Sequence, residues 1–366
     1  MAVTSADNLP TDAHQHVGFV SISPVRGTVE LVWACAFTII LCTWNIQHLT
    51  IASPYKSAWI VMAHKILWAL LTVFAPEFTC LWGIHEYIFA RIQARTMQHH
   101  GFGWWTMKHS FFASMGGYLL EYQNEGQIIV RSEEILWLAT EKLLVLPEIK
   151  CSEIDGLASE DTFQKAITAV QLFWFALQCI GRAVGRLEFA LFELTTLCFV
   201  SYTIITLFCW WKKPGGVSVR SKISCPSISA QDVDRMLEST KGEKRSLMLE
   251  LHIRQVDFDD NPPIGVYWEA MLIVFVGGVG AWHIAAWNYS FPSSVESILW
   301  KVSSVVATMG PIILWYAVDL GFPFYFIFFA YATARVFVVV ETIISLRSAP
   351  AGIYERVRWS DFLPHV

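Results

Sequence analysis

The chain has 366 residues, of which 54% are hydrophobic and 16% are charged, and its mean hydropathy is +0.44. An ordinary soluble domain carries about 25% charged residues, so the deficit indicates a protein that lies largely in a lipid bilayer. The formal net charge of −5 provides no broad basic surface, which argues against nucleic acid as a partner.

The first half of the chain contains four predicted membrane spans within residues 28–211, after a polar tail at residues 1–27 that lacks the segments of a cleavable signal peptide. A helix needs about 20 apolar residues to cross the hydrocarbon core. The four spans are Val29–Gln47, Ala58–Ala90, Thr162–Ile180 and Leu187–Trp211. Pro76 removes a helix hydrogen bond inside the second span, so we expect one long bent helix, with two half-spans as the alternative.

Two polar segments interrupt the spans. Residues near 96–162 are acidic and are expected to be solvated or interfacial, with one or two short amphipathic helices. Residues 212–265 form a polar loop between spans 4 and 5, with one expected amphipathic helix at Ala230–Leu251.

Three further spans are predicted within residues 266–345, at Val266–Trp287, Ile298–Tyr316 and Phe322–Ser345, followed by a tail at residues 346–366. The predicted fold is therefore an all-α, polytopic transmembrane helix bundle of about seven spans. An odd number of spans places the two chain ends on opposite sides of the membrane. The distribution of Lys and Arg favours a cytoplasmic N-terminus.

Ionisable side chains inside apolar segments are costly in a bilayer, so each is a candidate functional group. The catalytic candidates are Glu77, Glu193, Glu269, His283 and Arg335. An unpaired guanidinium in the middle of a span is very unfavourable, so Arg335 is expected to face the protein interior and to pair with a carboxylate such as Glu269 or Glu193. Such a pair either fixes helix packing or contacts a substrate.

His283 and Glu269 are 14 residues apart, which puts them on one helix face about 21 Å apart along the axis. They mark two depths of one expected cavity. A histidine that titrates near neutral pH is a common general acid or base, although a hydrogen-bonded packing residue is the alternative. Trp287, Asn288 and Glu341 are the expected substrate contacts.

Several kinds of chemistry lack their motifs in this sequence. The acidic segment at residues 257–261 is followed directly by Pro262 and Pro263, which argues against the helix that a diphosphate–magnesium site needs. Di-iron histidine boxes, a phosphate-binding glycine loop and a GxSxG motif are absent, and the eight cysteines form no CxxC motif. We therefore expect no cofactor and no metal.

The chain resembles a large family of fungal multi-pass integral membrane proteins, mostly uncharacterised, some of them encoded in secondary-metabolite gene clusters. The residues that carry the resemblance include Cys42-Thr43-Trp44 with His48-Leu49, Ala75-Pro76-Glu77, Met115-Gly116-Gly117, Trp210-Trp211 with Lys213-Pro214, His283 with Ala286-Trp287-Asn288, Arg335, Glu341, Tyr354, Trp359 and Pro364-His365. The sequence departs from the family pattern at Thr50-Ile51 and at residues 158–161. The resemblance implies a membrane location and a biosynthetic context, without assigning catalytic residues.

The function expected from these features is a membrane-embedded enzyme of fungal secondary metabolism, in the endoplasmic reticulum or another endomembrane. It would catalyse a redox-neutral cyclisation or rearrangement of an apolar terpenoid or polyketide–terpenoid intermediate, by epoxide opening, a carbocation or a pericyclic step. Pathway enzymes at the membrane are its possible partners. The alternatives are an acyltransferase that uses His283 as base and a non-enzymatic scaffold, sensor or transport accessory.

Overall fold

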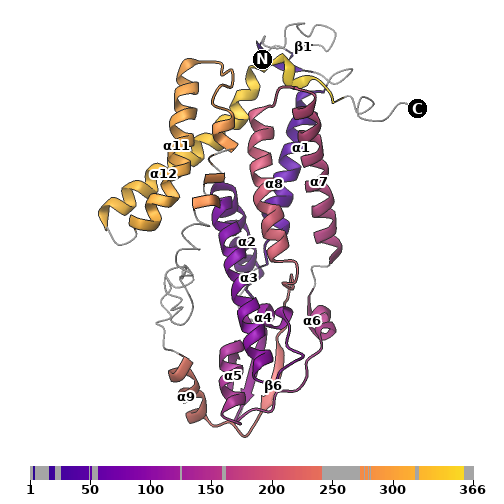
Figure 1. The fold of residues 1–366 in the computed structure, drawn as a ribbon, viewed down its shortest axis with the longest axis vertical. Helices are drawn as coiled ribbons and strands as arrows, with labels where there is room; N and C mark the ends of the chain where they lie inside the picture. Colours follow the sequence, from indigo (N-terminus) through magenta and orange to yellow (C-terminus); the bar gives the residue numbers. More distant parts are fainter. Residues whose placement is uncertain are drawn as a thin grey trace, which may run out of the picture.

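The computed structural model describes residues 3–4, 16–20, 26–48, 50–51, 57–123, 126–158, 162–240, 273–275, 277–278, 280, 282–317 and 321–357. Long helices dominate it (Figure 1). Within these residues, five helices are long and apolar enough to cross a membrane: Thr28–Asn45, Phe163–Val184, Leu191–Cys209, Ser294–Ala317 and Pro323–Arg347. The prediction of a mainly helical protein with several membrane-length segments is confirmed.

The long helices form one helical body around α8. Its members are α1 (Thr28–Ile40, continued by the π-turn η2, Leu41–Asn45), α7 (Thr162–Val184), α8 (Leu191–Cys209), α11 (Ser294–Ala317) and α12 (Phe322–Ile344). In α8, 67% of the membrane-length apolar segment is buried inside the protein. The corresponding buried share is 28% in α11 and 33% in α12. The outer helices therefore expose apolar side chains such as Phe326 and Phe329, which suits contact with lipid.

The predicted span Ala58–Ala90 is divided into two helices, α2 (Ala58–Phe74) and α3 (Pro76–His99), bent by 111° at the single residue between them. A residue before proline is pushed out of the helical region, and Ala75 has φ −143° and ψ 66°. Pro76 then starts α3, where its missing N–H costs nothing. A bend greater than a right angle turns the chain back, which favours the alternative of two half-spans.

The described parts of the two polar segments form one small unit of helices and strands, which we call the α/β unit. Its elements are α4 (Met107–Ser114), β4 (Tyr118–Tyr122), β5 (Gly126–Val130), α5 (Ser132–Thr140), α6 (Cys151–Leu157), β6 (Ser221–Cys225) and α9 (Ala230–Thr240). The strand order is β5-β4-β6, with β5 antiparallel and β6 parallel to β4. Trp105, Tyr118 and Ile223 belong to a hydrophobic core of its own. The sheet was not predicted from the sequence, which indicated two separate polar segments.

The opposite end of the helical body is closed by short segments from both ends of the chain (Figure 1). Strand β2 (His16–Val17) pairs antiparallel with β7 (Ala349–Pro350), and β1 (Val3–Thr4) pairs parallel with β3 (Phe19–Val20). The 3-10 turns η4 (Ser345–Arg347) and η5 (Ala351–Tyr354) flank β7. The described parts of the two terminal regions therefore lie at the same end.

The predicted count of seven spans is not confirmed. The described residues contain five candidate spans, or six if the bent pair α2–α3 counts as one. Most of the first half of the predicted span Val266–Trp287 lies outside the described residues, and the remainder is helical at Trp282–Ala285.

Candidate functional site

The apex of the α2–α3 pair lies against the middle of α12 and α8, and polar groups converge on it. The last carbonyls of a helix have no partner within the helix, and here α2 ends inside the protein. Arg335 of α12 donates from Nε to the carbonyl oxygen of Phe74 at 2.6 Å. The negative end of the α2 dipole favours a cation at this position. Arg335 therefore caps the end of α2 at the carbonyl of Phe74, to which the hydroxyl of Tyr331 also donates at 3.4 Å.

Glu77 completes the arrangement from the first turn of α3, where the positive end of the helix dipole favours an anion. Its Oε2 lies 3.4 Å from Nη2 of Arg335, and its Oε1 accepts a 2.5 Å hydrogen bond from the hydroxyl of Tyr331. Glu77 and Arg335 are each only 3% exposed. A buried ion pair is tolerable only with such additional hydrogen bonds.

We name Arg335, Glu77, Tyr331 and the carbonyl of Phe74 the apex network. Arg335 was predicted to face the interior and to pair with a carboxylate from another span, and it does so. In the described part of the chain this carboxylate is that of Glu77, whereas the predicted partner Glu193 pairs with Arg26 and the other predicted partner, Glu269, lies outside the described residues. Tyr331 was not anticipated. Its place one helical turn before Arg335, on the same face of α12, is the signal that could have revealed it.

A small cavity lies beside the apex network. Its lining includes Val73 and Pro76 at the helix break, Thr195 and Cys198 of α8, Val338 of α12, and the predicted site residues His283 and Arg335. The cavity has a volume of about 10 Å³, which is room for about one water molecule. Two of the predicted catalytic residues, His283 and Arg335, thus meet at one cavity.

His283 is only 4% exposed, and its chain segment packs against Trp300 of α11. Its carbonyl accepts a hydrogen bond from Nε1 of Trp300 at 3.2 Å, and the two rings lie 6.0 Å apart. Trp300 is itself 1% exposed. The indole therefore anchors the segment that contributes His283 to the cavity lining.

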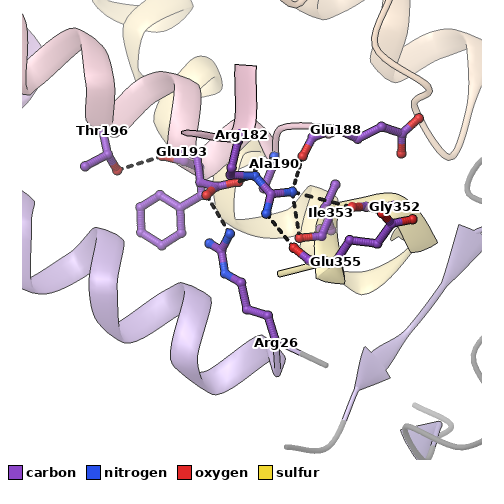
Figure 2. Close-up of polar contacts among 10 residues, drawn as sticks. Arg26, Arg182, Glu188, Ala190, Glu193, Thr196, Gly352, Ile353 and Glu355 are labelled. Atoms are coloured by element: carbon purple, nitrogen blue, oxygen red, sulfur yellow. Dashed lines mark hydrogen bonds and ion pairs between the residues drawn. The ribbon is translucent and has the colours of Figure 1, made fainter. Parts of the chain in front are cut away.

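Glu193 belongs to a different cluster, which joins Arg26 and Arg182 to the backbone around η5 (Figure 2). Its Oε1 lies 2.7 Å from Nη1 of Arg26, and its Oε2 lies 3.6 Å from Nε of Arg182. Arg182 is 1% exposed and also donates to the carbonyls of Glu188, Gly352, Ile353 and Glu355. Arg182 fastens four backbone carbonyls and Arg26 binds the carboxylate of Glu193, so we assign Glu193 a structural role.

The remaining predicted site residues are spread more widely. Glu269 lies outside the described residues. Asn288 and Trp287 are exposed, and Trp287 packs its ring against the ammonium of Lys301, so neither reaches the cavity. Glu341 is buried on α12, 4% exposed, three residues beyond Val338. In the described part of the chain, no group of three or more His, Cys, Asp or Glu side chains is placed to hold a metal ion.

Comparison with known proteins assigns a family but no activity. A search of curated proteins finds no match, and a search of solved structures finds none either. A model of a family of unknown function, DUF8562, matches residues 3–234 and 320–366, which is more than half of the chain. The matched stretches include Glu77, Tyr331 and Arg335, whereas His283 lies between them. The chain therefore belongs to the family of unknown function DUF8562.

Proposed function

We propose that this protein is an integral membrane enzyme that transfers protons to and from an apolar substrate, without redox change, at the cavity beside the apex network. The observation that carries the proposal is that His283 and Arg335, from segments 52 residues apart in the chain, line one buried cavity at a helix break. Broken helices at membrane depth are tolerated where they are sheltered by protein or line a cavity. A sheltered imidazole is suited to acid–base work.

The residues divide the task in a definite way. His283 gives a proton to, or takes one from, an atom placed in the cavity. Arg335 supplies a fixed positive charge beside that atom, and Glu77 with Tyr331 holds the guanidinium in place. Fixed charges in a dry site stabilise developing charge more strongly than they would in water. Glu77 is thus a positioning residue in this scheme and not the acid.

The substrate class follows from the surroundings. Apart from His283, Arg335 and Thr195 the cavity wall is apolar, and it lies within helices whose outer faces suit lipid, so an apolar molecule that partitions into the bilayer is the natural substrate. A terpenoid or polyketide–terpenoid intermediate meets this description. In an epoxide opening, the imidazolium gives its proton to the oxygen as the C–O bond breaks. A later loss of a proton from carbon restores the charge balance.

Room for one water is too little for such a substrate, so binding requires α12 to separate from the helix break. This small volume favours a second candidate function, in which the apex network is a lock that only fixes helix packing and the protein is a scaffold. The α/β unit, with its own core, would then be the surface that partners bind.

Deletion of the gene, followed by metabolite profiling and complementation, separates these two functions. We expect deletion to remove or change a product, and wild-type protein to restore it. His283→Ala should fail to restore it, although the variant is inserted in the membrane at normal abundance. The matched control is His64→Ala, because His64 is an exposed histidine on α2 that lies away from the cavity.

An unchanged metabolite profile after deletion would contradict the proposal that the protein is an enzyme and would favour its role as a scaffold. Full complementation by His283→Ala would contradict the assignment of the site. The readout identifies a product directly, so it does not depend on knowing the substrate in advance.

A further inference from the structure

Glu341 lies on α12 between the cavity and the end of the helical body where β2 pairs with β7. It is three residues beyond Val338, which lines the cavity, so the two share a helix face with a rise of about 4.5 Å between them. The adjacent Thr342 shares a 3.1 Å hydrogen bond with Thr195, another cavity residue. Glu341 is thus a buried carboxyl group within one helical turn of the proposed site.

Three buried polar atoms around this position have no hydrogen-bond partner in the described part of the chain. They are Oε1 of Glu341, Oε2 of Glu296 and the hydroxyl of Tyr289. Buried polar atoms are nearly always satisfied, so an unpartnered atom needs an occupant such as water or a proton. The Glu341 side chain is more than nine-tenths buried, and it is the deepest of the three.

Charged groups lead from Glu341 to the surface. Glu296 of α11 acts on Glu341 electrostatically, and so does Arg347, just after α12. Glu296 and Arg347 form an ion pair, with side chains 17% and 44% exposed. Tyr289 lies within electrostatic range of Glu341 as well.

We propose that Glu341 is a proton-relay residue, which exchanges protons between water at the Glu296–Arg347 edge and the cavity that His283 and Arg335 line. The proposal rests on the proposed function, because it supplies the protons that acid–base chemistry at the cavity uses. The proposal also follows from where Glu341 lies. Its buried carboxyl group has an oxygen without a hydrogen-bond partner in the described part of the chain, and it lies between the partly exposed Glu296–Arg347 ion pair and the buried His283.

The relay balances without any co-reactant other than water. A proton from water at the edge forms an O–H bond on the Glu341 carboxylate. It then passes through water in the cavity to His283, and Glu341 returns to its anionic form. Protons released from the substrate travel the same route outward.

Infrared spectroscopy tests the relay independently of turnover. We expect protein in lipid nanodiscs to show, in difference spectra between two pH values, the carbonyl band of a protonated carboxylic acid, with the shift in deuterated water that an exchangeable proton causes. Glu341→Gln should remove this band. The matched control is Glu121→Gln, a carboxylate paired with Lys222 in the α/β unit, which should leave it unchanged.

A second arm measures product formation. Loss of a relay should slow turnover by about 100-fold, the scale of a lost acid–base group, and should change its pH profile without changing KM. A Glu341→Gln spectrum identical to that of the wild type would overturn the relay. Loss of the band with unchanged turnover would also overturn it, since the proton would then not serve the cavity.

The experiments can reject the proposed function and the Glu341 relay independently of each other. If His283→Ala complements the deletion, the proposed function fails whatever the infrared band shows. If His283→Ala does not complement, but Glu341→Gln turns over normally, only the relay fails.

Discussion

At the scale of single residues, the apex network explains how a guanidinium is accommodated in an apolar interior. Arg335 meets a carboxylate, a helix-end carbonyl and, through Glu77, a tyrosine hydroxyl. Removing one member of such a set leaves a buried charge without compensation, which is more costly than replacing both charges by groups of similar size. The pair therefore matters for stability whether or not it serves catalysis.

We expect Arg335→Met to destabilise the protein by about 3–5 kcal/mol, and Glu77→Gln by a comparable amount. Each substitution leaves the charge of the other residue buried without its partner. The double variant should be less destabilised than the sum of the two single variants. Thermal unfolding in detergent, followed by intrinsic fluorescence, measures the three differences. Additive losses in the double-mutant cycle would show that the two groups do not interact.

At the scale of elements, the α/β unit depends on an unprotonated histidine. Nδ1 of His109 accepts hydrogen bonds from the backbone N–H of Thr106 at 3.1 Å and from its hydroxyl at 2.9 Å, while Nε2 donates to the carbonyl of Ile149 at 2.8 Å. Protonation of Nδ1 would break the bond from the backbone N–H of Thr106, and the Thr106 hydroxyl would have to become the acceptor. Burial lowers the pKa of His109 from its ordinary value, with Lys108 acting in the same direction and the bond to Ile149 opposing it.

This lowered pKa predicts how the stability of the unit changes with pH. Below about pH 6.5, the unfolded chain binds a proton that the folded unit does not, so stability falls as the pH is lowered from about 7 towards 5. Hydrogen exchange in α4 and α6, corrected for the intrinsic effect of pH, should show less protection at the lower pH. His109→Gln should remove most of this dependence, whereas the exposed control His99→Gln should keep it. Equal protection of wild-type α4 at both pH values would contradict the assignment.

At the scale of the whole molecule, the pairing of β2 with β7 places both terminal regions at one end, and the α/β unit lies at the other (Figure 1). Since α2 and α3 turn back on each other by 111°, they need not carry the chain across a membrane. From the β2–β7 pairing we predict that the described parts of the two terminal regions lie on the same side of the membrane, whereas seven spans would place the chain ends on opposite sides.

Thiol labelling of sealed vesicles checks this arrangement. We expect a variant that keeps only Cys151, in the α/β unit, and a variant with a single cysteine at Glu355→Cys, beyond η5, to react with a membrane-impermeant reagent from opposite sides. An N-terminal epitope tag should be accessible from the same side as position 355. Labelling of both cysteines from one side would be incompatible with a membrane across the helical body.

Much of the helical architecture could be predicted because hydropathy is a local property of consecutive residues. The predicted spans Thr162–Ile180 and Phe322–Ser345 agree closely with α7 and α12, since about 20 apolar residues suffice to identify such a helix. The break at Pro76 was predictable for the same reason, because proline acts on the residues next to it. The need to shelter Arg335 followed from the cost of a bare charge alone.

The tertiary structure decided everything that depends on residues distant in the chain. Pro76 ends α2, but only packing against α8 and α12 sets the bend of 111° and makes Glu77, rather than Glu193, the partner of Arg335. The pairing of β4 with β6 joins strands about 100 residues apart, which no local periodicity reports. Local apolar content therefore determined which segments are membrane-length helices. Long-range packing decided which charges meet, because burying a charge demands a partner without specifying where in the chain it lies.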